Sequence, residues 1–168
     1  MQLKGKTAII TGGGSGFGAS MADLFAKNGA KVIVADIDLD SARKVAEGTG
    51  GYALEVDVSN AKSVEQMKID IFKENEKVDI VVNNAGTTHL PAPMETIEED
   101  EFDRVFKVNC KSVYLTAKHF VPHFKENKSG VILNIASTAG VSPRPNLNWY
   151  NSSKGWMICL LYTSDAAD

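Results

Sequence analysis

The chain has 168 residues, of which 43% are hydrophobic and 23% are charged, and its formal net charge is −3. This length fits one domain, and the composition excludes a disordered chain, a collagen-like repeat and a disulfide scaffold. No apolar run approaches the roughly 18 residues of a membrane span, and without a basic excess we expect no binding of nucleic acid. Cys110 and Cys159 are too few for a disulfide framework, and no secretory apolar segment is visible, so we expect a cytoplasmic protein.

Short β-branched apolar runs alternate along the chain with amphipathic helical patterns. We expect strands at residues 7–11, 31–36, 52–58, 78–82 and 130–135. We expect helices at residues 16–28, 39–47, 61–75 and 97–124. Near-continuous apolar strands separated by helices predict a parallel sheet that is covered on both faces. The predicted fold class is therefore α/β, a doubly wound, three-layer Rossmann fold. Thr96, followed three residues later by Glu99, predicts a capping box at the start of the last helix.

A glycine-rich loop joins the first expected strand to the first expected helix. Glycines allow a tight turn and let the backbone approach a pyrophosphate at the N-terminus of the helix. The spacing of Gly12, Gly16 and Gly18 differs from the general dinucleotide pattern, which Gly14, Gly16 and Ala19 match loosely. Because the loop opens a strand–helix–strand unit, it predicts a nucleotide site. The expected cofactor contacts here are Gly12, Gly14, Ser15, Gly16, Phe17 and Gly18.

The second expected strand ends in a carboxylate. Asp36 lies 24 residues after Gly12, about where an acidic residue binds the ribose hydroxyls of NAD. A 2′-phosphate would be repelled by Asp36 and Asp38, and neither Ser15 nor Ile37 supplies a compensating positive charge. We therefore expect NAD rather than NADP, with Asp36 and Ile37 at its adenosine end.

Further motifs follow in chain order after the third, fourth and fifth expected strands. They are Asp57-Val58, Asn83-Asn84-Ala85-Gly86, Asn109 within the long helix, Ser137, and Tyr150-x-x-x-Lys154. Together with the glycine-rich loop, this series resembles the short-chain dehydrogenase/reductase family over residues 1 to about 158. The resemblance implies that Asp57 and Val58 contact the adenine ring, and that Asn83 braces the sheet. It also implies cofactor contacts from Asn84, Ala85 and Gly86.

The pattern Tyr-x-x-x-Lys occurs twice, at Tyr114-Lys118 and at Tyr150-Lys154. Either spacing places both side chains on one face of a helix. Tyr150 follows Ser137 by 13 residues, after the carboxyl end of a strand, where ligands bind in open α/β sheets. Tyr114 lies in the middle of a helix with no serine at a comparable distance. We therefore predict Tyr150 as the reactive tyrosine.

The family resemblance also implies a mechanism. Tyr150 would be the general acid/base, because an ammonium one helical turn away favours a phenolate. Ser137 would stabilise charge on the substrate oxygen, and Lys154 would hold the nicotinamide ribose. Asn109 would fix a water that relays protons to Lys154. The expected substrate is a small alcohol or carbonyl compound, as for a 3-oxoacyl-carrier-protein reductase or a sugar dehydrogenase. The alternative is a non-catalytic, dinucleotide-binding regulatory protein on the same fold.

Other candidate sites have less support. His119 and His123 are four residues apart, but Pro122 interrupts the helical pattern and no third ligand is evident, so we expect no metal site. Arg144 is expected to be a solvated loop residue.

The last ten residues do not continue the family pattern and resemble the in-frame translation of a transposase sequencing adapter. We therefore expect a C-terminally truncated dehydrogenase domain at residues 1–158 and a non-native tail at 159–168. Such a fold has about six strands and only five are visible, so the sheet is expected to lack its C-terminal edge. The 168-residue fragment is expected to be unstable and inactive, whereas the longer protein would form a homodimer or homotetramer.

Overall fold

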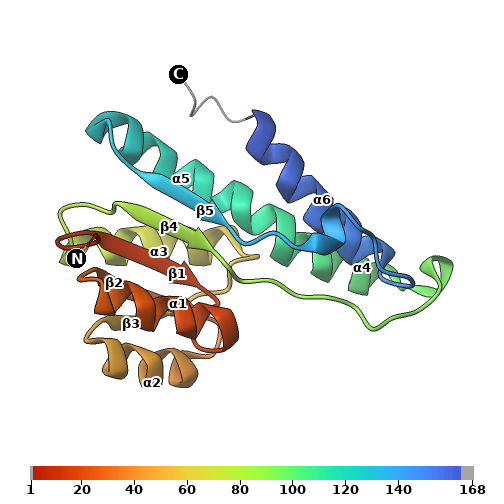
Figure 1. Cartoon of the computed structure of the whole chain (residues 1–168), viewed down its shortest axis with the longest axis horizontal. Coiled ribbons are helices and arrows are strands. Elements are labelled where there is room, and N and C mark those ends of the chain that lie inside the picture. Colours follow the sequence, from red (N-terminus) through yellow and green to blue (C-terminus); the bar gives the residue numbers. More distant parts are fainter. Residues whose placement is uncertain (1, 164–168) are drawn as a thin grey trace.

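A computed structural model of the chain describes residues 2–163, with side chains through residue 160. Its centre is a five-stranded sheet in which all the strands are parallel, in the order β3-β2-β1-β4-β5 (Figure 1). The strands are β1 (Thr7–Thr11), β2 (Lys31–Asp36), β3 (Tyr52–Glu55), β4 (Ile80–Asn83) and β5 (Val131–Asn134). The predicted α/β class and all five predicted strands are confirmed, although β3 ends three residues earlier than expected.

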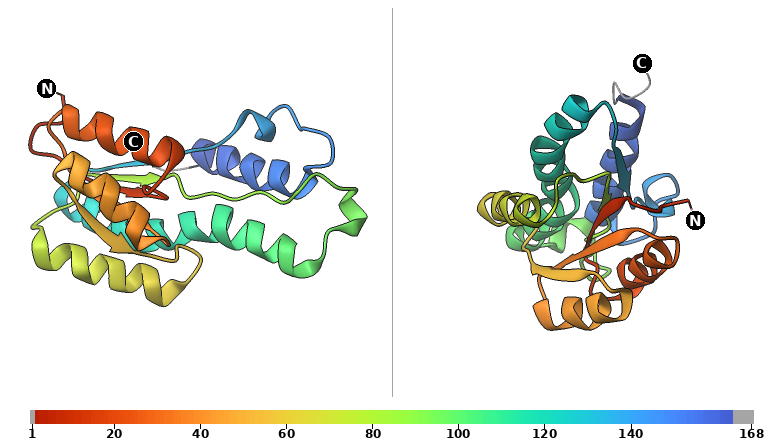
Figure 2. Two further views of the ribbon diagram at one scale, coloured as in Figure 1. Left: turned by 90° about the horizontal axis from the view of Figure 1, so that it is seen from below. Right: turned by 90° about the vertical axis from the view of Figure 1, so that its left-hand side faces the viewer.

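The centre of the sheet is buried on both faces, as its continuous apolar strands require, whereas Val131 and Leu133 of the outer strand β5 are 57% and 41% exposed. All five residues of β1 are buried, and Ile9 pairs with Ile33 of β2 and Val81 of β4. Helices α1 (Gly16–Lys27) and α2 (Leu39–Thr49) cover one face. Helices α3 (Ala61–Glu74) and α5 (Ser112–Asn127) cover the other (Figure 2). The result is the predicted arrangement of three layers.

The long helix predicted at 97–124 is divided in the structure. Helix α4 (Glu99–Phe106) passes through a π-helical segment (Lys107–Lys111) into α5. The predicted capping box is wrong, because the helix starts after Glu98 and no side chain caps it. Thr96 instead ends a short 3₁₀ turn, where its hydroxyl donates to the Pro93 carbonyl at 2.8 Å.

The last described helix is α6 (Asn148–Thr163). Helices α4 and α6 extend past the carboxyl ends of the strands and lie side by side there (Figures 1 and 2). Residues 159–163 continue α6, whereas 164–168, the remainder of the predicted tail, lie outside the described residues. The fold therefore brings the loops after β1, β2, β3 and β4 together at one edge of the sheet, beside α4 and α6.

Candidate active site

A cleft of about 620 Å³ opens at the carboxyl ends of β1, β2, β3 and β4. Eleven of the residues predicted to bind the cofactor line it: Gly12, Ser15, Gly16, Phe17, Asp36, Ile37, Asp57, Val58, Asn84, Ala85 and Gly86. Gly14 and Gly18, the other two in the loops, do not line it. The topology thus gathers motifs that are up to 74 residues apart in sequence.

The glycine-rich loop is closed so tightly at Gly12 and Gly18 that neither position has room for a side chain. A Cβ atom at Gly18 would lie 2.0 Å from the carbonyl oxygen of Gly12, and Gly12 itself has a φ of +61°. The Asn84 amide donates to the carbonyls of Thr11 at 2.9 Å and Gly12 at 3.0 Å. The Thr11 hydroxyl in turn accepts from the backbone N–H groups of Asn84 and Ala85. Asn84 therefore fastens the loop after β1 to the loop after β4.

Asp36 stands at the end of β2 and joins two loops. One carboxylate oxygen accepts from the backbone N–H of Gly14 at 2.9 Å, and the other from that of Asp38 at 3.1 Å. Asp57 is oriented in a similar way, because its carboxylate accepts from the N–H and the hydroxyl of Ser59. Both carboxylates are thus fixed at the rim of the cleft.

Asn83 and Asn109 are buried amides that join separate elements. Asn83 donates to the side chain of Asn134 on β5 at 2.7 Å and accepts from the Thr116 hydroxyl on α5 at 2.8 Å. Asn109 lies in the π-helical segment, and its amide donates to the Ser153 hydroxyl on α6 at 2.9 Å. A π turn inside an α-helix is often found at a functional site. The contacts of Asn83 fit the predicted bracing role, whereas the water relay predicted for Asn109 stays a prediction.

Lys154 connects α6 to the cleft. Its ammonium donates to the Ile135 carbonyl at 2.8 Å, and a Cβ atom at Gly86 would lie 3.5 Å from its Nζ. Only 5% of Lys154 is exposed, and this burial lowers the pKa of its ammonium. Burial also raises the pKa of the neighbouring Cys110 thiol to about 11, so that thiol is not a ready nucleophile.

The two candidate tyrosines differ in their surroundings. Tyr150 is half-buried and lies one helical turn before Lys154. Tyr114 is 56% exposed on α5, and neither it nor Lys118 lines the cleft. Tyr150, Ser137 and Lys154 do not line it either. The chain neighbours of Tyr150, Trp149 and Asn151, line a second cavity of about 340 Å³, together with residues of the segment 139–143. The Ser137 hydroxyl oxygen accepts from the Ala139 N–H at 3.1 Å.

Five further residues line the cleft without having been predicted: Val56, Ser59, Thr87, Arg104 and Val108. Four of them are chain neighbours of predicted site residues, so the only sequence feature that could have indicated them is that adjacency: Val56, Ser59, Thr87 and Val108. Arg104 belongs to no motif and reaches the cleft only because α4 packs beside the loop after β4.

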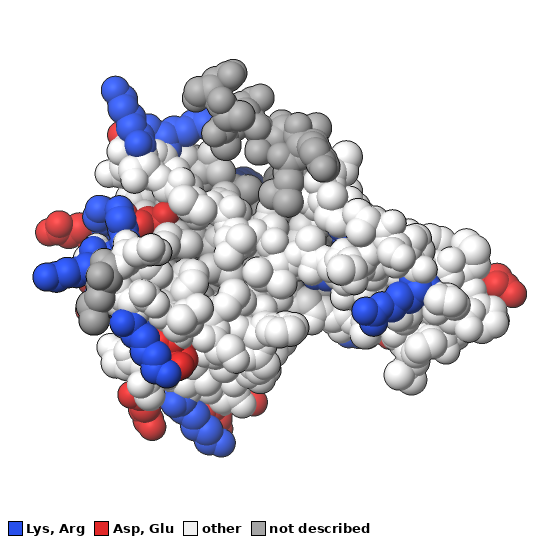
Figure 3. All heavy atoms as spheres, viewed as in Figure 1, with Lys and Arg blue, Asp and Glu red and all other residues white. Residues whose placement is uncertain are grey.

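His123, one of the two histidines considered as metal ligands, has contacts within the fold. His123 accepts from the backbone N–H of Val78 at 3.2 Å and packs against the ring of Phe72. Among residues 2–163, no cluster of three His, Cys, Asp or Glu side chains is placed to hold a metal ion. No helix in that range is long and apolar enough to cross a membrane. On the face shown in Figure 3, basic and acidic side chains are interspersed beside the amino ends of the strands.

A family model described as short chain dehydrogenase matches residues 6–165. The chain belongs to the short-chain dehydrogenase family. The match passes the predicted boundary at residue 158, and the origin of residues 159–168 stays a prediction.

Several relatives of known name are similar over most of the chain. The 4-formylbenzenesulfonate dehydrogenase TsaC1/TsaC2 of Comamonas testosteroni is 45% identical, over 95% of this chain and 66% of its own length. The 3-oxoacyl-[acyl-carrier-protein] reductase FabG of Thermotoga maritima is 34% identical, over 97% and 68%. A 3-ketoacyl-(acyl-carrier-protein) reductase from Brucella melitensis, complexed with NADH, superposes with a TM-score of 0.91 at 47% identity, over 94% and 67%. The chain thus spans about two thirds of the length of these relatives.

Proposed function

We propose that the chain forms the cofactor-binding and catalytic part of an NAD-dependent oxidoreductase, which transfers hydride between the cofactor and an alcohol or carbonyl substrate. The observation that carries the proposal is the position of Lys154. Its ammonium lies against Gly86 in the wall of the cleft, and it comes from the same helical face as Tyr150. A reactive tyrosine on α6 would therefore adjoin the nicotinamide end of a bound cofactor.

The cleft suits a dinucleotide in shape and in chemistry. Its glycine loop leads into the N-terminus of α1, where backbone N–H groups and the helix dipole favour a pyrophosphate. Asp36, whose carboxylate also accepts from the Gly14 N–H of this loop, offers a carboxylate oxygen to ribose hydroxyls and repels a 2′-phosphate. We therefore propose NAD rather than NADP, and the NADH in the Brucella melitensis structure supports a nicotinamide cofactor.

In the proposed mechanism, the bound cofactor supplies or accepts the hydride, and the protein handles the proton. Tyr150 donates a proton to the carbonyl oxygen during reduction and removes it from the alcohol during oxidation. Lys154 favours the phenolate by its positive charge, and Ser137 donates a hydrogen bond to the substrate oxygen. Asn109 holds α6 in place through Ser153, whose hydroxyl also donates to the Tyr150 carbonyl at 2.7 Å.

The substrate class and the assembly are also proposals. The names of the relatives favour a small molecule with a carbonyl or hydroxyl group, of the kind used by 3-oxoacyl reductases and by sugar or alcohol dehydrogenases. We propose a cytoplasmic homodimer or homotetramer for the longer protein. The alternative of a dinucleotide-binding regulator is less well supported, because the catalytic set Ser137, Tyr150 and Lys154 is complete.

The proposal is tested by measuring cofactor binding and turnover together. NADH and NADPH are titrated into the longer protein that contains this chain, and NADH consumption is then followed with an aromatic aldehyde, a 3-oxoacyl thioester and a ketose. We expect NADH to bind at least about tenfold more tightly than NADPH, and one carbonyl class to be reduced. Binding of NADH without turnover of any carbonyl would favour the regulator. Absence of binding would contradict both functions.

A further inference from the structure

The segment Thr87-Thr88 directly follows Gly86, and Thr87 continues the wall of the cleft. The backbone N–H of Thr87 donates to Asn109 Oδ1 at 2.8 Å, and its carbonyl accepts from Asn109 Nδ2 at 2.8 Å. One buried side chain therefore satisfies both backbone polar groups of Thr87. These two hydrogen bonds fix the main chain at Thr87. The Thr87 hydroxyl and the Thr88 carbonyl remain for other partners.

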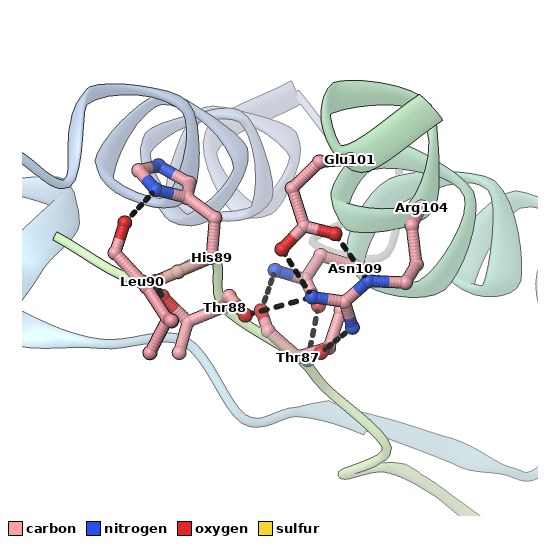
Figure 4. A network of polar contacts seen from close by, with 7 residues as sticks. All are labelled: Thr87, Thr88, His89, Leu90, Glu101, Arg104 and Asn109. Carbon is pink, nitrogen blue, oxygen red and sulfur yellow. Dashed lines mark hydrogen bonds and ion pairs between the residues drawn. The ribbon is translucent and has the colours of Figure 1, made fainter. Parts of the chain in front are cut away.

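Arg104 of α4 supplies those partners. Its Nη1 donates to the Thr87 hydroxyl, and its Nη2 donates to the Thr88 carbonyl at 2.9 Å (Figure 4). Arg104 also lines the cleft, so it borders the same space as the segment it holds. The loop after β4 is thus clamped from α4 as well as from the π-helical segment.

Glu101 fixes the orientation of that guanidinium. Nε and Nη2 of Arg104 each donate to one carboxylate oxygen of Glu101 at 2.8 Å, which is the two-pronged geometry that carboxylates and guanidinium groups favour. The hydrogen bonds from Arg104 lower the pKa of Glu101. With its charge matched in this way, Arg104 is suited to holding the loop rather than to capturing an anion.

We infer that Arg104 is a positioning residue for the cofactor cleft. Oriented by Glu101, it keeps Thr87 and Thr88 in the conformation that receives the cofactor. A binding segment that is already fixed loses less conformational entropy when the ligand binds, and this favours binding. The inference rests on the proposed function, because it assigns Arg104 a role in binding the nicotinamide cofactor.

The test measures NADH binding by fluorescence, in the longer protein that contains this chain. Arg104→Gln should raise the Kd for NADH about tenfold. Arg104→Lys keeps the charge beside Glu101, but it has one donor group where the guanidinium has a planar fork, so affinity should not be restored. Arg43→Gln is the matched control. Arg43 pairs with Asp40 at the same spacing on α2 but does not line the cleft, so its Kd should stay within about twofold of the original.

Two further measurements separate positioning from a general loss of stability. Arg104→Gln and Arg43→Gln should change the unfolding temperature of the cofactor-free chain by similar small amounts. Thr87→Val removes the hydroxyl partner of Arg104, so the two substitutions combined should raise the Kd by less than the product of their separate effects. Three results would overturn the inference and leave the proposed function intact. They are an unchanged Kd for NADH in Arg104→Gln, a Kd in Arg104→Lys equal to that of the unsubstituted protein, and effects of Arg104→Gln and Thr87→Val on the Kd that multiply independently. If the unsubstituted longer protein binds no NADH, both the inference and the proposed function fall.

Discussion

At the scale of single residues, the cofactor loop depends on positions where a side chain has no room. Gly18 is the clearest case, because an added Cβ would lie 2.0 Å from the Gly12 carbonyl oxygen. Gly18→Ala should lower the free energy of unfolding by about 2 kcal/mol or more, and it should also abolish NADH binding, since the loop has to move. Chemical denaturation and an NADH titration check the two effects.

The control for that substitution is another glycine inside a helix. Gly48 lies near the end of α2, and an added Cβ there would meet nothing within 4 Å. Gly48→Ala should stabilise the protein by about 0.5–1 kcal/mol, because alanine has the higher helix propensity. Equal effects at the two positions would show that the loop is not closed in the way described.

Most residues that line the cleft could be predicted from the sequence because they follow the ends of strands. In a parallel sheet, the carboxyl ends of the strands lie on the same side of the sheet. Asp36, Asp57 and Asn84 are examples of this rule. Arg104 was not predicted, since its contact with Thr87 depends on how α4 packs against a loop. No local pattern of charges or apolar residues reports such a contact.

At the scale of elements, the strands were predicted well and the long helix less well. An apolar pattern at helical spacing continues from α4 into α5, so periodicity alone gives one helix there. The π-helical segment between them adds a residue to one turn, and both Asn109 and Cys110 are buried in it. That adjustment is set by packing against α6, where Asn109 meets Ser153.

A buried carboxylate joins the first and fourth strands at the amino end of the sheet. Asp79 accepts from the Thr7 N–H at 3.0 Å and pairs with the ammonium groups of Lys6 and Lys77. Burial alone raises the pKa of Asp79, but these hydrogen bonds outweigh it, so the pKa lies below the ordinary 3.8. Its stabilisation is therefore complete above about pH 3.8 and is lost as the pH falls through the lower, folded-state value.

Asp79→Asn should cost about 2 kcal/mol of unfolding free energy at neutral pH, because an amide weakens the buried pairing. The loss should shrink as the pH falls below 3.8, since the original carboxyl is then protonated as well. Asp70→Asn provides the comparison, because Asp70 pairs with Lys73 on the exposed side of α3. Its effect should be much smaller than that of Asp79→Asn, because solvent screens an exposed pair. A pH-independent difference at Asp79 would contradict this account.

At the scale of the whole molecule, the fold class followed from the alternation of strands and helices, whereas the strand order needed the structure. From β1 the chain adds β2 and β3 on one side, and it then adds β4 and β5 on the other side. The cleft opens beside β1, where the strand order reverses in this way. Ligands bind at such a reversal in doubly wound sheets. The position of the cleft therefore agrees with the topology as well as with the motifs.

The most direct test of the central claim is a comparison of the two tyrosines, in protein whose turnover has first been recorded without substitution. Tyr150→Phe should lower kcat at least about a thousandfold, because the proton donor is lost, and leave the Kd for NADH within about twofold. Tyr114→Phe, in the second Tyr-x-x-x-Lys, should leave both unchanged. Turnover that survives in Tyr150→Phe, or that is lost in Tyr114→Phe, would contradict the assignment of Tyr150 as the general acid/base.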